Sequence, residues 1–242
     1  MLQHNRVIVL RTVRFKENSL IVSCYAREHG RITLLVNNAF PKGKKAGLNV
    51  YFQPLSILDV VYYYRPNAEM YRVKEVTPTY AFTSLHLNPI KLTITIFLSE
   101  LIYRTVREQE TNQHLFAFIE SSVQMLDNLN TGVANFHLIF MVQLSRYLGF
   151  YPLNRWSPEE PYFDIKNGVF CGVEPAHGFV LEKQTSKLLS NLIDTPMLNP
   201  EMLSLNQNQR QILIEAIASF YRFHLGSGIR FRTLPILIQL FE

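Results

Sequence analysis

Five short segments rich in β-branched and aromatic residues follow one another within the first 80 residues. Such segments are typical of β-strands. They are Val7–Leu10, Leu20–Tyr25, Ile32–Val36, Phe52–Tyr64 and Tyr71–Val76. Gly30, which precedes the third segment, can take the positive φ that a compact hairpin connection requires. Five strands in a stretch of this length favour a small closed barrel, and the five-stranded OB barrel, which binds oligonucleotides, is the commonest candidate.

After residue 85 the apolar residues recur at the spacing of helices. Positions three and four apart predict helices around residues 94–102, 116–126, 136–148 and 213–224. Gly149 favours the end of the third of these helices. A last helix is predicted to begin at Thr233, with Pro235 in its first turn. The pattern therefore predicts an α+β chain, with an OB-like barrel over residues 1–80 and a helical domain over residues 81–242.

Residues 150–180 interrupt the helices with a segment rich in proline and glycine. Within it, Phe163–Ile165 and Val169–Cys171 flank the sequence Lys166-Asn167-Gly168. An Asn-Gly pair between short apolar runs favours a type I′ turn, because both central residues take a positive φ. We therefore predict a β-hairpin insertion at about residues 151–181 of the helical domain.

Positive charge is concentrated in the N-terminal third. Residues 1–80 hold 12 Lys and Arg against 5 Asp and Glu, a net charge of +7, whereas residues 81–242 hold 12 against 14, a net charge of −2. A localised positive field favours a polyanionic partner, because it raises local concentration and encounter rate. The connection between the third and fourth predicted strands carries Lys42, Lys44 and Lys45. We interpret it as a phosphate-contacting arm in preference to a solubilising loop.

The sequence offers little for covalent chemistry. Its two cysteines, Cys24 and Cys171, form no Cys-x-x-Cys pair, and Cys171 with His177 supplies only two of the four ligands of a structural zinc site. The same two residues lack the orienting group and oxyanion motif that a nucleophile and its base require. We therefore predict no metal, no other cofactor and no enzymatic activity.

No segment is a candidate membrane span or secretory signal. No window reaches the roughly 18 apolar residues that a span requires. The apolar run Val7–Leu10 is interrupted at once by Arg11. We expect a cytoplasmic protein without a membrane partner.

Several segments, taken in order, resemble the RecO family of bacterial recombination mediators. They are Glu17–Ile32, Gln53–Leu55 with Leu58–Tyr62, Leu144–Pro152, Tyr221–Leu225 and Arg232–Leu237, and together the resemblance covers nearly the whole chain. Many members hold zinc with two cysteine pairs around the insertion, whereas only Cys171 stands there in this chain. We expect the hairpin to persist without metal, held by its aromatic residues Tyr162, Phe163, Phe170 and Phe179.

The resemblance implies an OB domain followed by a helical domain. It implies binding of single- and double-stranded DNA, annealing of complementary strands and help in loading the recombinase. The implied protein partners are RecR and the acidic, hydrophobic C-terminal tail of the single-strand DNA-binding protein. The implied location is the nucleoid of the bacterial cytoplasm.

The candidate DNA contacts are long cations in or beside the predicted barrel. They are the loop residues Lys42, Lys44 and Lys45, then Arg14, Lys16, Arg27, Arg31, Arg65, Arg72 and Lys74, with Arg230 and Arg232 as a second patch. The candidate stacking platforms are Tyr62, Tyr63, Tyr64 and Tyr71. Strand alternation places Tyr63 opposite Tyr62 and Tyr64, so at least one of the three belongs to the core.

The alternative from another class is a protein–protein adaptor. Its basic barrel would dock an acidic partner without binding DNA directly. Affinity for protein-free DNA at moderate salt separates the two functions.

Overall fold

The computed structural model describes residues 1–40 and 47–241. The chain forms two compact units, Met1–Asn128 and Leu129–Glu242. The change from strands to helices near residue 80 was predicted, but the border between the compact units lies further along the chain, because two helices pack with the strands of the first unit. Among the described residues, no helix combines the length and the apolar character that crossing a bilayer demands.

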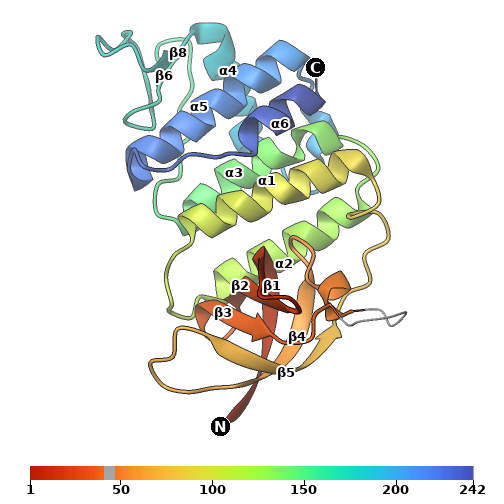
Figure 1. The fold of residues 1–242 in the computed structure, drawn as a ribbon. Coiled ribbons are helices and arrows are strands. Elements are labelled where there is room, and N and C mark those ends of the chain that lie inside the picture. The colour runs from red at the N-terminus through yellow and green to blue at the C-terminus, as the bar shows by residue number, and fades with distance from the viewer. Residues whose placement is uncertain (41–46, 242) are drawn as a thin grey trace. The chain divides into compact units, whose positions relative to one another are not determined.

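The first unit contains the predicted five-stranded barrel (Figure 1). Its strands are β1 Leu2–Phe15, β2 Ser19–Ala26, β3 Gly30–Val36, β4 Ile57–Tyr63 and β5 Tyr71–Pro78. They close in the order β1-β2-β3-β5-β4, and the β3–β5 pair is the parallel one. β1 is longer than predicted. Its residues Leu2–Ile8 pair with β4, and its residues Val7–Phe15 pair with β2, with a bulge between Val9 and Arg11 on the β2 side.

The fourth strand begins later than its composition predicts. Residues Leu48–Tyr51 form a short 3-10 helix, and Leu55 adopts a positive φ of 58°. The N–H of Leu55 donates to the carbonyl oxygen of Val9 at 2.8 Å, and the N–H of Val9 donates to Ser56 at 2.9 Å. The prediction of a strand from Phe52 was therefore wrong, because the chain turns at Leu55 before it enters the barrel wall.

Two helices complete the first unit, α1 Pro89–Thr105 and α2 Gln113–Asn128. Asn88 caps α1, since its side chain accepts hydrogen bonds from the N–H groups of Ile90 and Lys91. α1 packs on β1, where the hydroxyl of Ser99 donates to the carbonyl oxygen of Leu10. α2 packs on the barrel through Phe116, whose ring stacks on Tyr25 at 6.2 Å. Both helices thus pack on the same side of the barrel, at β1 and β2.

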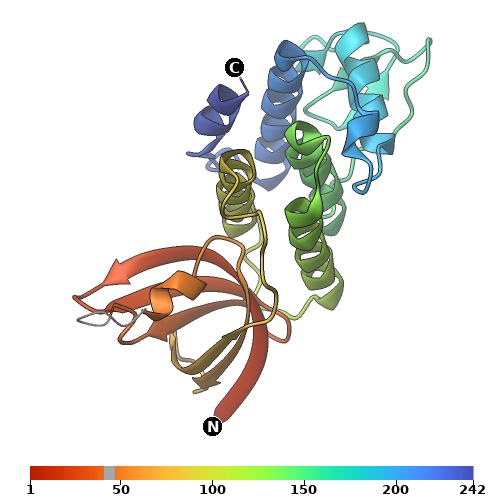
Figure 2. The same cartoon turned by 90° about the vertical axis from the view of Figure 1, so that its right-hand side faces the viewer.

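The second unit is helical, with α3 Val133–Tyr147, α4 Lys183–Asp194, α5 Gln207–Leu225 and α6 Leu234–Leu240. α3 packs against α5 and α4 (Figure 2). Gly149 has the predicted positive φ, 83°, just past the end of α3. Thr233 occupies the predicted N-cap position of α6, with Pro235 in the first turn. The helices predicted from periodicity are confirmed, whereas α4 was not predicted.

The insertion is a three-stranded sheet, β7-β6-β8, made of β6 Tyr162–Asp164, β7 Val169–Cys171 and β8 Val180–Leu181. The predicted hairpin is confirmed, but its type I′ turn is wrong. Four residues connect Asp164 to Val169, and only Gly168 among them has a positive φ, 71°. The carboxylate of Asp164 accepts the N–H groups of Lys166 and Asn167, at 2.9 and 3.0 Å, and this stabilises the longer loop.

Candidate nucleic-acid interface

The predicted cations of the barrel lie mostly on its surface. Six of them are exposed, namely Arg14, Lys16, Arg27, Arg65, Arg72 and Lys74, and Arg31 is half-buried. The loop lysines Lys42, Lys44 and Lys45 lie outside the described residues. Among the exposed cations, Lys74 forms an ion pair with Glu75 at 3.0 Å, which offsets its charge. The surface of the barrel is therefore basic over several of its strands and turns.

These cations do not form a single patch. Arg14 lies near the end of β1 and Lys16 lies in the turn between β1 and β2, whereas Arg27 lies in the turn between β2 and β3. β2 has 8 residues, so its two ends are roughly 23 Å apart at the usual rise of a strand. Arg14 is held in place, since it lies 4.8 Å from the ring of Phe40 and donates to the carbonyl oxygen of Glu17 at 2.9 Å. Only an extended polyanion would reach both ends of the strand.

Arg31 stabilises the end of a helix. Its guanidinium donates to the carbonyl oxygens of Tyr103 and Val106, at 2.8 and 2.7 Å, at the C-terminus of α1. A cation is favourable there because the last carbonyl groups of a helix lack intrahelical partners. Burial lowers the pKa of Arg31, and the side chain remains a cation. The predicted DNA contact thus has a structural task, which the sequence did not reveal.

Tyr103 lies between two arginines. The guanidinium groups of Arg11 and Arg31 are 5.3 and 4.5 Å from the centre of its ring. Arg11 also donates to the Tyr103 hydroxyl at 3.3 Å, and this hydrogen bond is the main cause that lowers the pKa of Tyr103. Arg104 and Arg107 follow at the same helix end. Sequence reasoning missed Arg11, Arg104 and Arg107; the signal that could have found the last two is their spacing of three at the end of a predicted helix.

The aromatic residues of β4 and β5 divide between the core and the surface. Tyr62 is fully buried, which confirms the prediction that one of the three adjacent tyrosines belongs to the core and excludes Tyr62 as a stacking surface. Tyr63 is 44% exposed on the other face of the strand. Tyr64 and Tyr71 are half-buried and stacked at 5.3 Å, and His29 stacks on Tyr64 at 5.9 Å.

Comparison with known proteins identifies the family. A family model described as Recombination protein O N terminal matches residues 1–82, and one described as Recombination protein O C terminal matches residues 86–233. The chain belongs to the RecO family. DNA repair protein RecO of Phocaeicola vulgatus is 35% identical over 243 residues, which cover 100% of both chains. DNA repair protein RecO of Flavobacterium psychrophilum is 34% identical over 238 residues, which cover 98% of each chain.

The family membership confirms the resemblance found in the sequence and makes this chain a RecO-family DNA repair protein. The matches leave only residues 83–85 between the two family models. α1 and α2 therefore belong to the C-terminal family model although they pack with the barrel in the first compact unit. The helix end that carries Tyr103 and Arg107 is thus a RecO C-terminal segment placed beside the N-terminal barrel.

The second predicted basic patch belongs to the other unit. Arg230 and Arg232 are exposed in the connection between α5 and α6. Their place in the second unit separates them in the chain from the barrel cations, and their role in binding DNA stays a prediction.

Three of the four aromatic residues expected to hold the insertion, Phe163, Phe170 and Phe179, contact other aromatic rings. Phe163 and Phe170 contact each other with ring centres 5.0 Å apart, and Phe179 packs on Phe223 at 4.9 Å. Burial is the main cause that raises the pKa of the Cys171 thiol, so the thiolate is disfavoured. Within the part of the chain that the structure describes, no three His, Cys, Asp or Glu side chains converge on a point where a metal could bind.

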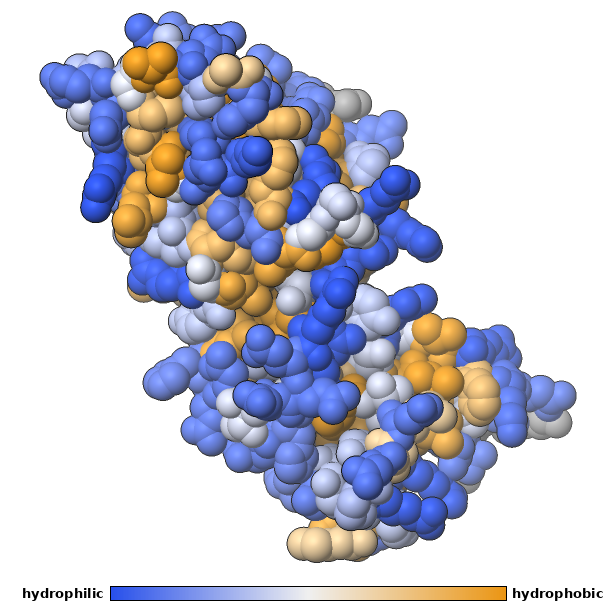
Figure 3. Space-filling model, turned by 90° about the vertical axis from the view of Figure 1, so that its left-hand side faces the viewer, coloured by the Kyte–Doolittle hydropathy of each residue, from blue (hydrophilic) through white to orange (hydrophobic). Residues whose placement is uncertain are grey.

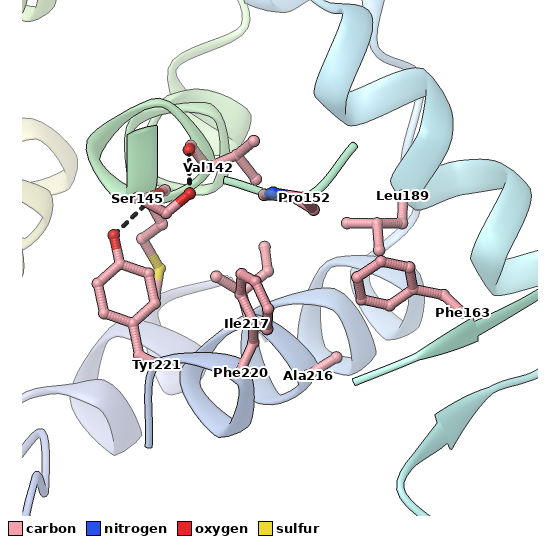
Figure 4. Close-up of a pocket in the computed structure, with 10 residues that line it drawn as sticks. Val142, Ser145, Pro152, Phe163, Leu189, Ala216, Ile217, Phe220 and Tyr221 are labelled. Atoms are coloured by element: carbon pink, nitrogen blue, oxygen red, sulfur yellow. Dashed lines mark hydrogen bonds between the residues drawn. The ribbon is translucent and has the colours of Figure 1, made fainter. Parts of the chain in front are cut away.

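An apolar pocket of the second unit lies between α3, α5, α4 and the insertion (Figure 4). Its volume is about 10 Å³, which is about the space of a single water molecule. The Tyr221 hydroxyl beside it donates to the carbonyl oxygen of Met141 at 2.7 Å. Such a space is a feature of core packing, and it does not hold a small-molecule ligand.

Proposed function

We propose that this RecO-family protein is a recombination mediator that binds single- and double-stranded DNA through its barrel. In this proposal it anneals complementary strands and helps load the recombinase together with RecR. The tail of the single-strand DNA-binding protein is a further partner, and the bacterial nucleoid is the place of action. The protein acts by binding and without covalent chemistry.

The observation that carries the proposal is the distribution of exposed cations over a closed barrel. Arg14 and Lys16 at one end of β2 and Arg27 at the other would contact phosphates that are several nucleotides apart. Contacts to phosphates carry no sequence information, and annealing requires that any sequence be bound. Neutralisation of phosphates on two strands also lowers the repulsion that opposes their pairing.

Fluorescence anisotropy of a labelled single-stranded oligonucleotide over a series of salt concentrations tests the proposal. We expect affinity to fall log-linearly with salt, with little dependence on sequence. Replacement of the loop lysines in K42A/K44A/K45A should weaken binding evenly and flatten the slope by up to roughly three phosphate contacts. The matched control is K166A/K183A/K187A, which removes the same charge from the second unit. An annealing assay with two complementary oligonucleotides then tests the next step.

Absence of binding even at low salt would overturn the DNA-binding proposal. The adaptor would then account for the basic barrel, with an acidic protein segment as its ligand. Binding of DNA without annealing would leave the first part of the proposal and remove the second.

A further inference from the structure

A groove runs along β3 of the first unit, beside the β4–β5 connection and the segment that follows α1. It consists of two adjoining hollows of about 400 and 230 Å³. Both are lined by Arg31, Ile32, Thr33 and Gln109, so one hollow continues into the other. The larger hollow by itself falls in the range of ligand-binding clefts, roughly 300–1,000 Å³. In Figure 1 the two bordering connections lie on the left, the side that faces the viewer in Figure 3, where the surface of the barrel is mostly hydrophilic.

The larger hollow is basic. Arg31, Arg104 and Arg107 line it together with Tyr103, and no carboxylate side chain of the described residues is among its lining. Arg104 is paired with Glu100 at 2.6 Å, whereas Arg107 is exposed and uses its Nε to donate to the carbonyl oxygen of Arg104 at 3.1 Å. The terminal amino groups of Arg107 are therefore directed by a fixed Nε and can donate to an anion in the hollow.

The smaller hollow is aromatic. His29, Tyr64 and Tyr71 line it, and their rings form a continuous stack with centre-to-centre distances of 5.9 and 5.3 Å. The ring of Tyr71 rests in turn on the buried Tyr62, also at 5.3 Å. Because Tyr62 belongs to the barrel core, the stack is anchored and loses little side-chain entropy when a ligand stacks on it. Glu69 is the one carboxylate at this end among the described lining residues.

We propose that this groove binds a single strand of DNA, with phosphates beside Arg31 and Arg107 and unpaired bases against Tyr64 and Tyr71. The proposal rests on the DNA-binding function proposed above and assigns the part of the barrel that distinguishes single strands from duplexes. Arginine beside a tyrosine stack suits a single strand, since its backbone is anionic and its base faces are free. In a duplex the base faces are covered by neighbouring pairs and are not available to the stack.

Two variants separate the two ends of the groove. Arg107→Gln should lower the salt slope for a dT oligonucleotide by about 0.7 and the affinity several-fold, because one phosphate contact is lost. Tyr64→Leu keeps an apolar side chain on the barrel core and should lower the affinity for single strands by about 5- to 150-fold, with an unchanged salt slope. Affinity for a duplex of the same length should change by less than about twofold in Tyr64→Leu.

The controls are matched to each change. Tyr51→Leu alters an exposed tyrosine of the 3-10 helix Leu48–Tyr51 that does not line the groove, and Arg155→Gln alters an exposed arginine of the second unit. A wild-type photo-crosslink from an oligonucleotide that carries 5-iododeoxyuridine does not depend on the folding of a variant. We expect its crosslinked peptide to contain Tyr64 or Tyr71.

The outcomes distinguish this inference from the function on which it rests. If wild-type protein binds DNA but Arg107→Gln and Tyr64→Leu behave like their controls, the groove is wrong and DNA binding stands. Crosslinks confined to peptides without groove residues would also overturn the groove. If wild-type protein binds no DNA, both proposals fail together.

Discussion

Asp127 at the end of α2 holds the chain where it passes from the barrel to α1. Its carboxylate accepts the N–H groups of Thr83, Ser84 and Leu85, at 3.0, 2.8 and 2.6 Å, and the Thr83 hydroxyl at 3.1 Å. Asp127→Asn keeps the shape but turns an NH₂ group toward donors. Thr83 donates to one carboxylate oxygen, and the N–H groups of Ser84 and Leu85 donate to the other. The amide has a single oxygen, so one of these two sets loses its acceptor, and we expect a loss of about 2–4 kcal/mol in the free energy of unfolding.

Urea denaturation followed by circular dichroism at pH 7 measures this loss. The matched control is Asp194→Asn, an exposed aspartate bonded to Asn154 at 2.7 Å, which should cost less than about 0.5 kcal/mol. Burial alone would raise the pKa of Asp127, but the hydrogen bonds from Thr83, Ser84 and Leu85 hold it below its ordinary value. The wild-type advantage should therefore be complete above about pH 4 and shrink as the pH falls further. A loss below about 1 kcal/mol, or one equal to that of the control, would refute the reasoning.

Three further changes test how other contacts stabilise the fold. Arg31→Lys should lower the free energy of unfolding by about 1–2 kcal/mol, because an ammonium group replaces the guanidinium that donates to two carbonyl oxygens. Urea denaturation should show a smaller loss for Arg27→Lys, since Arg27 is exposed. In the same assay, Gly30→Ala should lower the free energy of unfolding by about 1–3 kcal/mol more than Gly178→Ala. Both glycines have a positive φ. An added Cβ at Gly30 would lie 2.5 Å from the backbone oxygen of Glu110, whereas one at Gly178 would face open space. Burial lowers the pKa of His137 to about 3, so the unfolded chain takes up a proton first as the pH falls from about 6.5. This group should consequently make the wild-type protein about 2 kcal/mol less stable at pH 5 than at pH 7.5, and His137→Phe should remove that share of the pH dependence.

Local patterns in the sequence were sufficient to predict the elements whose burial follows their own periodicity. β3 alternates between buried and half-buried residues, and α2 buries one face. The spacing of their apolar residues therefore predicts a strand and a helix. The start of the fourth strand could not be predicted in the same way. Its first residues are apolar and aromatic like a strand, and only the hydrogen bonds between Leu55 and Val9 reveal the turn. The predicted type I′ turn was wrong for a related reason. The carboxylate of Asp164 accepts hydrogen bonds from the N–H groups of Lys166 and Asn167, and these bonds stabilise a longer loop.

The sequence predicted which cations of the candidate interface are exposed, but it did not predict which residues these cations contact. Exposed cations such as Arg27 and Arg72 follow from composition, because arginine is rarely buried. The hydrogen bonds of the Arg31 guanidinium depend on the C-terminal end of α1, whose carbonyl groups lie more than 70 residues further along the chain. No local pattern contains that information. Lys42 and its neighbours remain predictions from composition alone.

The groove exists because three features of distant parts of the sequence meet in one unit. Gly30 lacks a Cβ, so the backbone at residues 108–110 can approach it closely, and the N–H of Arg31 donates to Glu108 at 3.0 Å. This approach brings the arginines at the end of α1 beside β3. The parallel pairing of β3 with β5 places Tyr71 opposite Leu34, on the same strand that carries Arg31. A cation at one end of β3 and a tyrosine stack further along are thus consequences of barrel closure, and any change that releases the 108–110 segment should weaken single-strand binding even when both arginines remain.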